Sequence, residues 1–214
     1  YSHMSTPRKR KPGYVGVAWD NVDTRISEEG EIQLKSPGNM VGYYKAPELT
    51  AECYTDDGYF KTGDRGEYTP DGLLRITGRV KELFKTSKGK YVAPVPIENL
   101  LNSDSLVELS CVSGVGRPAC FAVVQLAEEF RPKMSDENFQ REASAKLEAL
   151  LDSINSQVEG YEQMQYIAVV TDQCDTANNF LTPTLKIKRD VIESTYAPYL
   201  DAWYDARQKV IWQN

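Results

Sequence analysis

Hydrophobic positions in the first eighty residues come in short runs that alternate with turn-forming residues. These runs predict strands over residues 14–17, 22–26 and 31–35. Glycine and proline within residues 28–30 and 36–38 supply the turns that separate them. We therefore expect the first part of the chain to be rich in short strands.

A hairpin gives the strongest local signal in this part of the chain. Predicted strands over residues 66–68 and 73–77 flank the turn sequence Thr-Pro-Asp-Gly at residues 69–72. Proline presets φ at the first turn position, and glycine accepts a positive φ at the end. The segments Thr-Gly-Asp (62–64) and Thr-Gly-Arg (77–79) lie at the two ends of the hairpin. Pairing of the strands would bring these two segments close together.

After Arg79 the pattern changes to a mixture of strands and helices. Residues 80–86 are a further strand candidate, and a polar loop follows over residues 87–90. Pro96 can occupy the first turn of a short helix over residues 96–102, because that turn does not need its backbone N–H.

The remaining elements alternate between apolar strands and helical spacing. Two apolar strands, over residues 106–113 and 120–126, form a predicted hairpin. A helix begins near Ser135, with acidic residues at the positive end of its dipole. The later elements are a buried strand over residues 166–170, a polar connection over 172–184 and a helical stretch from about Ile187 to Lys209. The aromatic residues of that stretch, which we interpret as its packed face, are Tyr196, Tyr199, Trp203 and Tyr204.

The pattern as a whole predicts an α+β protein in two parts. A strand-rich first segment is followed by a second segment of strands and helices, with the break near residues 79–82. A length of 214 residues is enough for each part to bury its own core.

Composition and charge exclude several classes of protein. With 25 Lys and Arg against 31 Asp and Glu, the formal net charge is −6, which argues against a general nucleic-acid binder. One histidine, His3, and four cysteines without a CxxC pair argue against a zinc site and a histidine-based triad, so we expect no metal site. No apolar run approaches the roughly 18 residues of a transmembrane helix, and no secretory signal is present. We expect reduced thiols and a cytoplasmic location.

Three side chains are candidates for chemistry. The Asp64 carboxylate, in a glycine-containing turn, can accept two hydrogen bonds from a diol. Arg79, opposite it, carries a guanidinium suited to ribose or phosphate oxygens. Lys186, near the end of a long polar loop, can deliver a positive charge to a phosphate. Taken singly, each has a plainer interpretation: a capping carboxylate, a surface ion pair and a solvated lysine.

Together with their surroundings these residues form an ordered series of motifs. The series resembles the adenylate-forming superfamily, which includes acyl-CoA synthetases, firefly-type luciferases and the adenylation domains of peptide synthetases. The last segment is similar to the C-terminal lysine motif in the form common in long-chain fatty acyl synthetases. The resemblance covers about residues 13–196, and its segments are YFKTGD (59–64), DGLLRITGR (71–79), KELFK (81–85), GKYVAP (89–94) with IE (97–98), and LTPTLKIKR (181–189).

The resemblance implies a role for each matching residue. Residues 1–80 would be the end of a large AMP-binding domain, a β-barrel-like subdomain, and residues 81–214 a small mobile lid domain. Asp64 would bind the ribose hydroxyls of ATP with help from Arg79, and Lys81 would be the hinge between the domains. Lys186 would contact the carboxylate and phosphate oxygens, and Ser87, Lys88 and Gly89 would face the pantetheine arm of coenzyme A. The chain departs from the family in having Leu185 where glycine often precedes the lysine, and Lys188 is a second candidate for the catalytic lysine.

The implied function is that of an ATP-dependent carboxylate–CoA ligase acting on a fatty or aryl acid. Such an enzyme forms an acyl-adenylate and pyrophosphate, and then acyl-CoA and AMP. The chain shows no Gly/Ser/Thr-rich phosphate loop. We therefore expect the N-terminal remainder of the same enzyme as its partner, the Mg²⁺ ligand to lie outside this chain, and the chain alone to be inactive. Two alternatives remain: an adenylation module that loads a carrier protein or a reductase, and a non-catalytic module that kept the fold.

Overall fold

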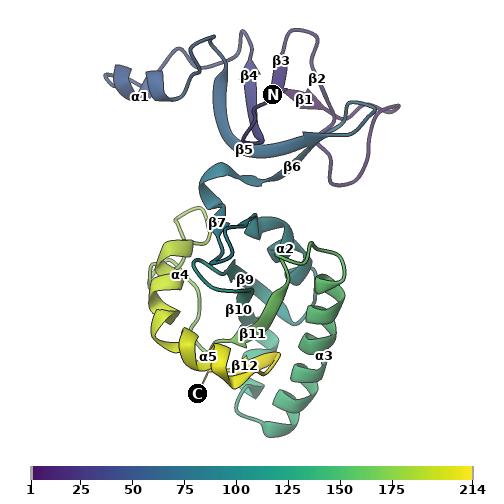
Figure 1. Ribbon diagram of the computed structural model, residues 1–214, viewed down its shortest axis with the longest axis vertical. Helices are drawn as coiled ribbons and strands as arrows, with labels where there is room; N and C mark the ends of the chain where they lie inside the picture. The colour runs from purple at the N-terminus through teal and green to yellow at the C-terminus, as the bar shows by residue number, and fades with distance from the viewer. Residues whose placement is uncertain (1, 214) are drawn as a thin grey trace. The chain divides into compact units, whose positions relative to one another are not determined.

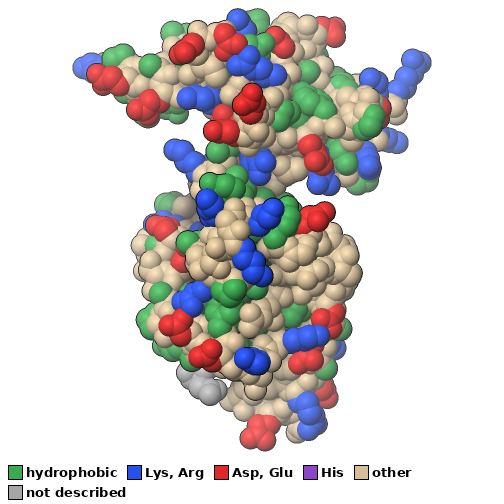
Figure 2. All heavy atoms as spheres, viewed as in Figure 1, with side chains coloured by type: hydrophobic (Ala, Val, Ile, Leu, Met, Phe, Trp, Pro, Cys, Tyr) green, Lys and Arg blue, Asp and Glu red, His purple; other side chains and the backbone are tan. Residues whose placement is uncertain are grey.

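The computed structural model describes residues 2–213 and divides into two compact units, Tyr1–Leu83 and Phe84–Asn214 (Figure 1). Both units combine strands with helices, so the predicted α+β class is confirmed. Acidic and basic side chains are interspersed over the face of each unit that Figure 2 shows. In the part of the chain that the structure describes, no helix has the length and apolar character needed to cross a membrane.

The first unit is built on a four-stranded antiparallel sheet. Its strands run in the order β3 (Asp23–Ile26), β4 (Glu31–Lys35), β5 (Phe60–Tyr68) and β6 (Leu74–Arg79). The predicted strands over residues 22–26 and 31–35 are thereby confirmed. The other elements of this unit are the paired strands β1 (His3–Met4) and β2 (Val17–Ala18), the short helix α1 (Pro47–Glu52) and the 3-10 turn η1 (Val80–Glu82).

The hairpin between β5 and β6 forms as its turn sequence predicts. Thr69 N–H donates to Leu73 O at 2.9 Å and Gly72 N–H donates to Thr69 O at 2.9 Å. Gly72 has φ +84°, a conformation that glycine adopts with little strain because it has no side chain. By contrast, the strand predicted over residues 14–17 is correct only at Gly16, which forms an isolated antiparallel bridge with Leu74, and at Val17, because Gly13 and Gly16 have positive φ and interrupt the extended backbone.

The strand predicted over residues 80–86 is also only partly correct. Val80–Glu82 forms the 3-10 turn η1, and only β7 (Phe84–Lys85) is extended, pairing with β8 (Tyr91–Val92). Lys81 and Glu82 are adjacent polar residues, so the alternation that a half-buried strand needs is absent there. Helix α2 (Pro94–Leu101) begins earlier than predicted, because Pro94 rather than Pro96 takes its first position.

A mixed sheet with helices on both faces forms the second unit. The antiparallel hairpin of β9 (Val107–Ser113) and β10 (Cys120–Leu126) is confirmed, and β11 (Met164–Val169) and β12 (Val210–Trp212) extend the sheet in parallel. Helix α3 (Glu137–Asn155) lies with α2 on one face, and α4 (Arg189–Tyr196) and α5 (Leu200–Ala206) lie on the other (Figure 1). The short helices η2 (Glu128–Lys133) and η3 (Ala197–Tyr199) complete the unit.

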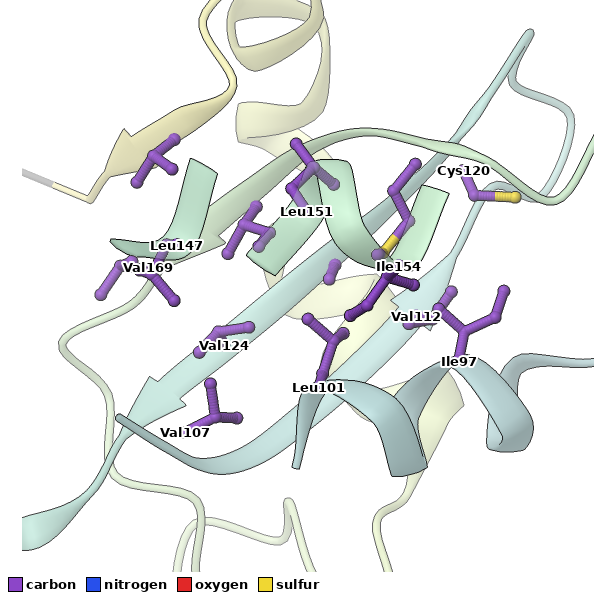
Figure 3. Close-up of a cluster of buried hydrophobic side chains, with 14 of the residues drawn as sticks. Ile97, Leu101, Val107, Val112, Cys120, Val124, Leu147, Leu151, Ile154 and Val169 are labelled. Carbon is purple, nitrogen blue, oxygen red and sulfur yellow. The ribbon is translucent and has the colours of Figure 1, made fainter. Parts of the chain in front are cut away.

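Alternate side chains of the sheet enter two separate cores. The core under α2 and α3 is shown in Figure 3, where Leu101 of α2 and Leu151 of α3 project towards the sheet. The core under α4 and α5 takes the intervening sheet residues, such as Phe121 and Tyr166. Because both faces are covered, β10 is buried along its whole length and is apolar except at Gln125, in line with the apolar strand predicted over residues 120–126.

The C-terminal part departs most from the prediction. The helical stretch expected over residues 187–209 is divided, because Pro198 has no N–H to continue α4, and Arg207 ends α5 with φ +52°. Strand β12 was not predicted. The expected packing of the aromatic residues is confirmed for Tyr196, Trp203 and Tyr204, which belong to the core under α4 and α5, whereas Tyr199 is 44% exposed.

Helix α3 is capped by a different residue from the one predicted. The side chain of Asp136, not of Ser135, accepts the N–H of Asn138 at 2.8 Å. The cap therefore lies one residue further along the chain, and its carboxylate also interacts favourably with the helix dipole.

All four cysteines are free thiols, as expected, and they should differ strongly in reactivity. Burial raises the pKa of Cys111 and of Cys120 to about 12, whereas Cys53 is only partly buried. At about pH 8 iodoacetamide, which attacks the thiolate, should modify Cys53 first and leave Cys111 and Cys120 protected until the protein is denatured. Peptide mass spectrometry measures the three rates. Equal rates in the native and denatured protein would contradict the buried positions.

Candidate functional site

Asp64 and Arg79 meet where the β5–β6 hairpin ends. They are paired in the β5–β6 register, and Arg79 Nε lies 3.1 Å from Asp64 Oδ1. The two side chains keep 30% (Asp64) and 54% (Arg79) of their surface exposed. Within residues 2–213 the carboxylate has no other ion pair or hydrogen bond, so it retains lone pairs for a ligand. The proximity predicted from strand pairing is confirmed.

The turn predicted at residues 62–64 is instead part of strand β5, where a network of hydrogen bonds holds Gly63 and Asp64. Gly63 has φ +72°, and its N–H donates to Glu31 Oε1 at 2.9 Å. The Thr62 hydroxyl donates to Ile32 O at 2.7 Å and accepts the N–H of Asp64 at 3.0 Å. A register shift in the β4–β5 pairing lies at the same place. Glu31 was not among the predicted site residues, because a charged residue at the start of a strand is also typical of a solvated edge.

Lys81 lies in η1, shortly before the boundary between the two units at Leu83 and Phe84. Its side chain is exposed, and among residues 2–213 no hydrogen bond or ion pair engages its ammonium group. The backbone returns to an extended conformation at Leu83, with φ −66° and ψ 131°.

The polar loop over residues 87–90 is the turn between β7 and β8. Gly89 has φ +78°, and its N–H donates to Thr86 O at 2.9 Å. The space beside Gly89 is open, since a Cβ there would meet only the end of the Lys85 side chain at 3.8 Å. Ser87 N–H also donates to Arg117 O at 2.9 Å, which ties the loop to the β9–β10 turn. Ser87, Lys88 and Gly89 are all exposed.

A second tight loop presents Lys186. Leu181 and Ile187 form an antiparallel bridge, and Thr182 N–H donates to Lys186 O at 2.8 Å. The Thr182 hydroxyl accepts the N–H of Lys186 at 3.1 Å. Leu185 has φ +59°, a left-handed backbone conformation that glycine would adopt more freely than leucine. We call residues 181–188 the lysine loop.

The two lysines of this loop differ in their surroundings. The ammonium group of Lys188 donates to the Asn179 side chain, and its backbone N–H donates to Phe180 O at 2.8 Å. Lys186 is exposed, and in the described part of the chain its ammonium group makes no hydrogen bond or ion pair. Lys186 is therefore the lysine that is free to contact a ligand.

A buried ion pair lies directly after the lysine loop. Arg189 Nη1 donates to Glu98 Oε1 at 2.6 Å and Nη2 donates to Glu98 Oε2 at 3.1 Å. Glu98 Oε1 also accepts the N–H of Val112 at 2.7 Å, and Arg189 Nη1 donates to Val112 O at 2.8 Å. Glu98 and Arg189 both lie within the sequence motifs, but they are too far apart in the chain for local spacing to predict their contact.

The predicted site residues fall into two groups by unit. Asp64, Arg79 and Lys81 belong to the first unit, whereas the 87–89 turn and Lys186 belong to the second. No group of three or more acidic, cysteine or histidine side chains among residues 2–213 is arranged to hold a metal ion.

Comparison with known proteins finds relatives over most of the chain. Residues 82–208, more than half of the chain, match the family described as AMP-binding enzyme C-terminal domain. The long-chain-fatty-acid–CoA ligase FadD15 of Mycobacterium tuberculosis is 30% identical over 207 residues, which cover 91% of this chain and 34% of that protein. The long-chain-fatty-acid–CoA ligase 1 of Homo sapiens is 31% identical over 189 residues, which cover 82% of this chain and 27% of that protein.

Solved structures show the same fold. The adenylation domain of a carboxylate reductase from Mycobacterium chelonae matches with a TM-score of 0.73 at 23% identity, covering 92% of this chain and 34% of that chain. The chain thus spans only 34% and 27% of the lengths of these two curated relatives.

Proposed function

The chain belongs to the family of AMP-binding enzyme C-terminal domains, and from this we propose that it is the C-terminal part of an ATP-dependent carboxylate–CoA ligase. The observation that carries the proposal is the uncommitted ammonium group of Lys186, held at the tip of a tight loop within the domain that the family covers. The proposed substrate is a long-chain fatty acid, because the relatives at 30–31% identity are long-chain-fatty-acid–CoA ligases.

In the first half-reaction a carboxylate oxygen attacks the α-phosphorus of ATP, and pyrophosphate leaves. Two anions approach each other in this step, so a cation beside the developing charge is the main help that a protein can give. Lys186 supplies that cation. The ribose hydroxyls donate to the Asp64 carboxylate. Arg79 orients this Asp64 carboxylate and adds positive charge at the nucleotide site. Mg²⁺ would neutralise the triphosphate, and we place its ligands outside this chain.

In the second half-reaction the thiol of coenzyme A attacks the acyl carbonyl, AMP leaves and the thiol proton passes to solvent. We assign the domain boundaries 1–80 and 81–214 and a hinge at Lys81, about which the C-terminal domain turns between the two steps. The turn of Ser87, Lys88 and Gly89 would then face the pantetheine arm. The open space beside Gly89 supports this assignment.

The test of this function is made on the complete ligase that contains this chain. It should release pyrophosphate from ATP and form acyl-adenylate only with a long-chain fatty acid, and it should form acyl-CoA and AMP when coenzyme A is added. The 214-residue chain by itself should release no pyrophosphate. Transfer to a carrier-protein thiol but not to coenzyme A would favour the carrier-loading alternative. A complete protein without any carboxylate-dependent turnover would favour the non-catalytic module.

Asp64→Asn should raise the KM of the complete ligase for ATP by roughly 10–100-fold, because hydrogen bonds to a charged acceptor contribute about 1.5–3 kcal/mol. Steady-state kinetics with varied ATP at saturating fatty acid measures this change. Asp56→Asn is the matched control, since Asp56 is exposed in the same unit. Equal KM values for the two variants would remove Asp64 from the nucleotide site.

We also propose a cytoplasmic location for the enzyme. Its four cysteines are free thiols, which fits a reducing compartment.

A further inference from the structure

The lysine loop is exposed at its tip and anchored at its C-terminal end. Arg189 is the first residue of α4 and follows Lys186 by three positions. Its guanidinium makes a two-pronged contact with Glu98 of α2 and a third contact with Val112 of β9. The side chains are only 14% (Arg189) and 7% (Glu98) exposed. One arginine therefore fixes the start of α4 to two other elements.

The chain that leads into the lysine loop, over residues 172–180, is anchored too. Gln125 is buried in β10, and its Oε1 accepts the N–H of Cys174 at 2.6 Å. The Tyr196 hydroxyl donates to Asp172 Oδ2 at 2.9 Å. Phe180, just before the loop, is buried in the core under α4 and α5. Both stems of the lysine loop are thus held, while the residues at its tip remain in solvent.

Stability alone does not account for an ion pair in this position. Well-packed apolar side chains of similar size often stabilise a core as much as a buried ion pair or more. An arginine–carboxylate fork gives something different, which is a fixed direction of approach through two parallel hydrogen bonds. Here the fixed direction is that of the backbone from which Lys186 projects.

We propose that Arg189 and Glu98 are positioning residues for the adenylation half-reaction. They hold the C-terminal stem of the lysine loop in one conformation, so that Lys186 is already oriented towards the reacting phosphate. The proposal rests on the function assigned above to Lys186. It predicts selectivity between the half-reactions, because the turn of residues 87–89 is anchored separately, through Ser87 N–H to Arg117 O and Gly116 N–H to Lys85 O.

The test uses Arg189→Lys in the complete ligase, since lysine keeps the charge and one contact to Glu98 but loses the fork. Adenylation is measured as fatty-acid-dependent exchange of pyrophosphate into ATP, and thioester formation as attack of coenzyme A on preformed acyl-adenylate. We expect adenylation to slow by roughly 10–100-fold and thioester formation to change by less than about twofold. Arg141→Lys, at an exposed arginine of α3, is the matched control and should leave both rates unchanged.

If Arg189 only stabilised the fold, Arg189→Lys would slow both half-reactions alike, because the same unit carries both loops. Equal slowing of the two half-reactions would overturn the proposal. Unchanged rates would overturn it as well. A second arm combines Arg189→Lys with Lys186→Ala. If Arg189 acts through Lys186, the double variant adenylates no more slowly than Lys186→Ala alone, and a further loss would contradict this.

Hydrogen exchange separates failure of the proposal from failure of the function. In Arg189→Lys, peptides covering residues 176–188 should exchange faster while peptides from β10 keep their rates. Unchanged exchange of the loop would overturn the anchoring itself, whether or not the protein adenylates. A complete protein that does not adenylate, but whose loop loosens as expected, would overturn the assigned function and leave the anchoring intact.

Discussion

Lys186→Ala in the complete ligase is expected to slow the adenylation half-reaction by roughly 10²–10³-fold, which is the usual effect of removing one preorganised donor at a developing negative charge. The KM for ATP should change little, because this contact forms mainly in the transition state. Thioester formation from preformed acyl-adenylate should keep its rate. Pyrophosphate exchange and single-turnover kinetics measure the two half-reactions separately.

Lys188→Ala provides the matched control for Lys186→Ala. The Lys188 ammonium group is engaged with Asn179 inside the loop, so its removal should slow adenylation by less than about tenfold through a looser loop. A larger loss for Lys188→Ala than for Lys186→Ala would exchange the roles of the two lysines. Full activity of both variants would exclude the loop from the chemistry.

Glu98→Ala is expected to lower the free energy of unfolding of the second unit by about 3–5 kcal/mol, because it removes the carboxylate that forms a two-pronged ion pair with the buried guanidinium of Arg189. It also removes the acceptor of the Val112 N–H, which cannot reach water inside the unit. Urea unfolding followed by tryptophan fluorescence measures the loss, since Trp203 and Trp212 lie in this unit.

The control for Glu98→Ala is Glu148→Ala, at an exposed glutamate of α3. Its unfolding free energy should stay within about 0.5 kcal/mol of the parent protein, as for most surface substitutions. A loss below about 1 kcal/mol for Glu98→Ala would show that the ion pair is hydrated in solution rather than buried.

Local signals predicted much of this fold correctly. The turn at residues 69–72 encodes its own geometry, and strand pairing then brings Asp64 and Arg79 together without further information. The break between α4 and α5 at Pro198 could also have been predicted from the sequence, because proline lacks the N–H that a continuous helix needs.

Contacts between distant parts of the chain could not be predicted in this way. Strand β12 is three residues long, and its pairing with β11 depends on the whole sheet being in place. Glu98 and Arg189 look like solvated charges when each is considered alone, and only the packing of α2 and α4 around β9 makes them partners. The same holds for Glu31, whose carboxylate accepts the N–H of Gly63 from the neighbouring strand.

The backbone conformation of Leu185 affects the free energy of ordering the lysine loop. Its φ of +59° lies in a region that costs a residue with a side chain roughly 1–2 kcal/mol. Glycine would adopt the same φ without this cost, so leucine destabilises this conformation of the loop relative to glycine. The hydrogen bonds between Thr182 and Lys186 and the anchored stems of the loop must therefore offset this cost, and they are formed in the folded protein before any substrate binds.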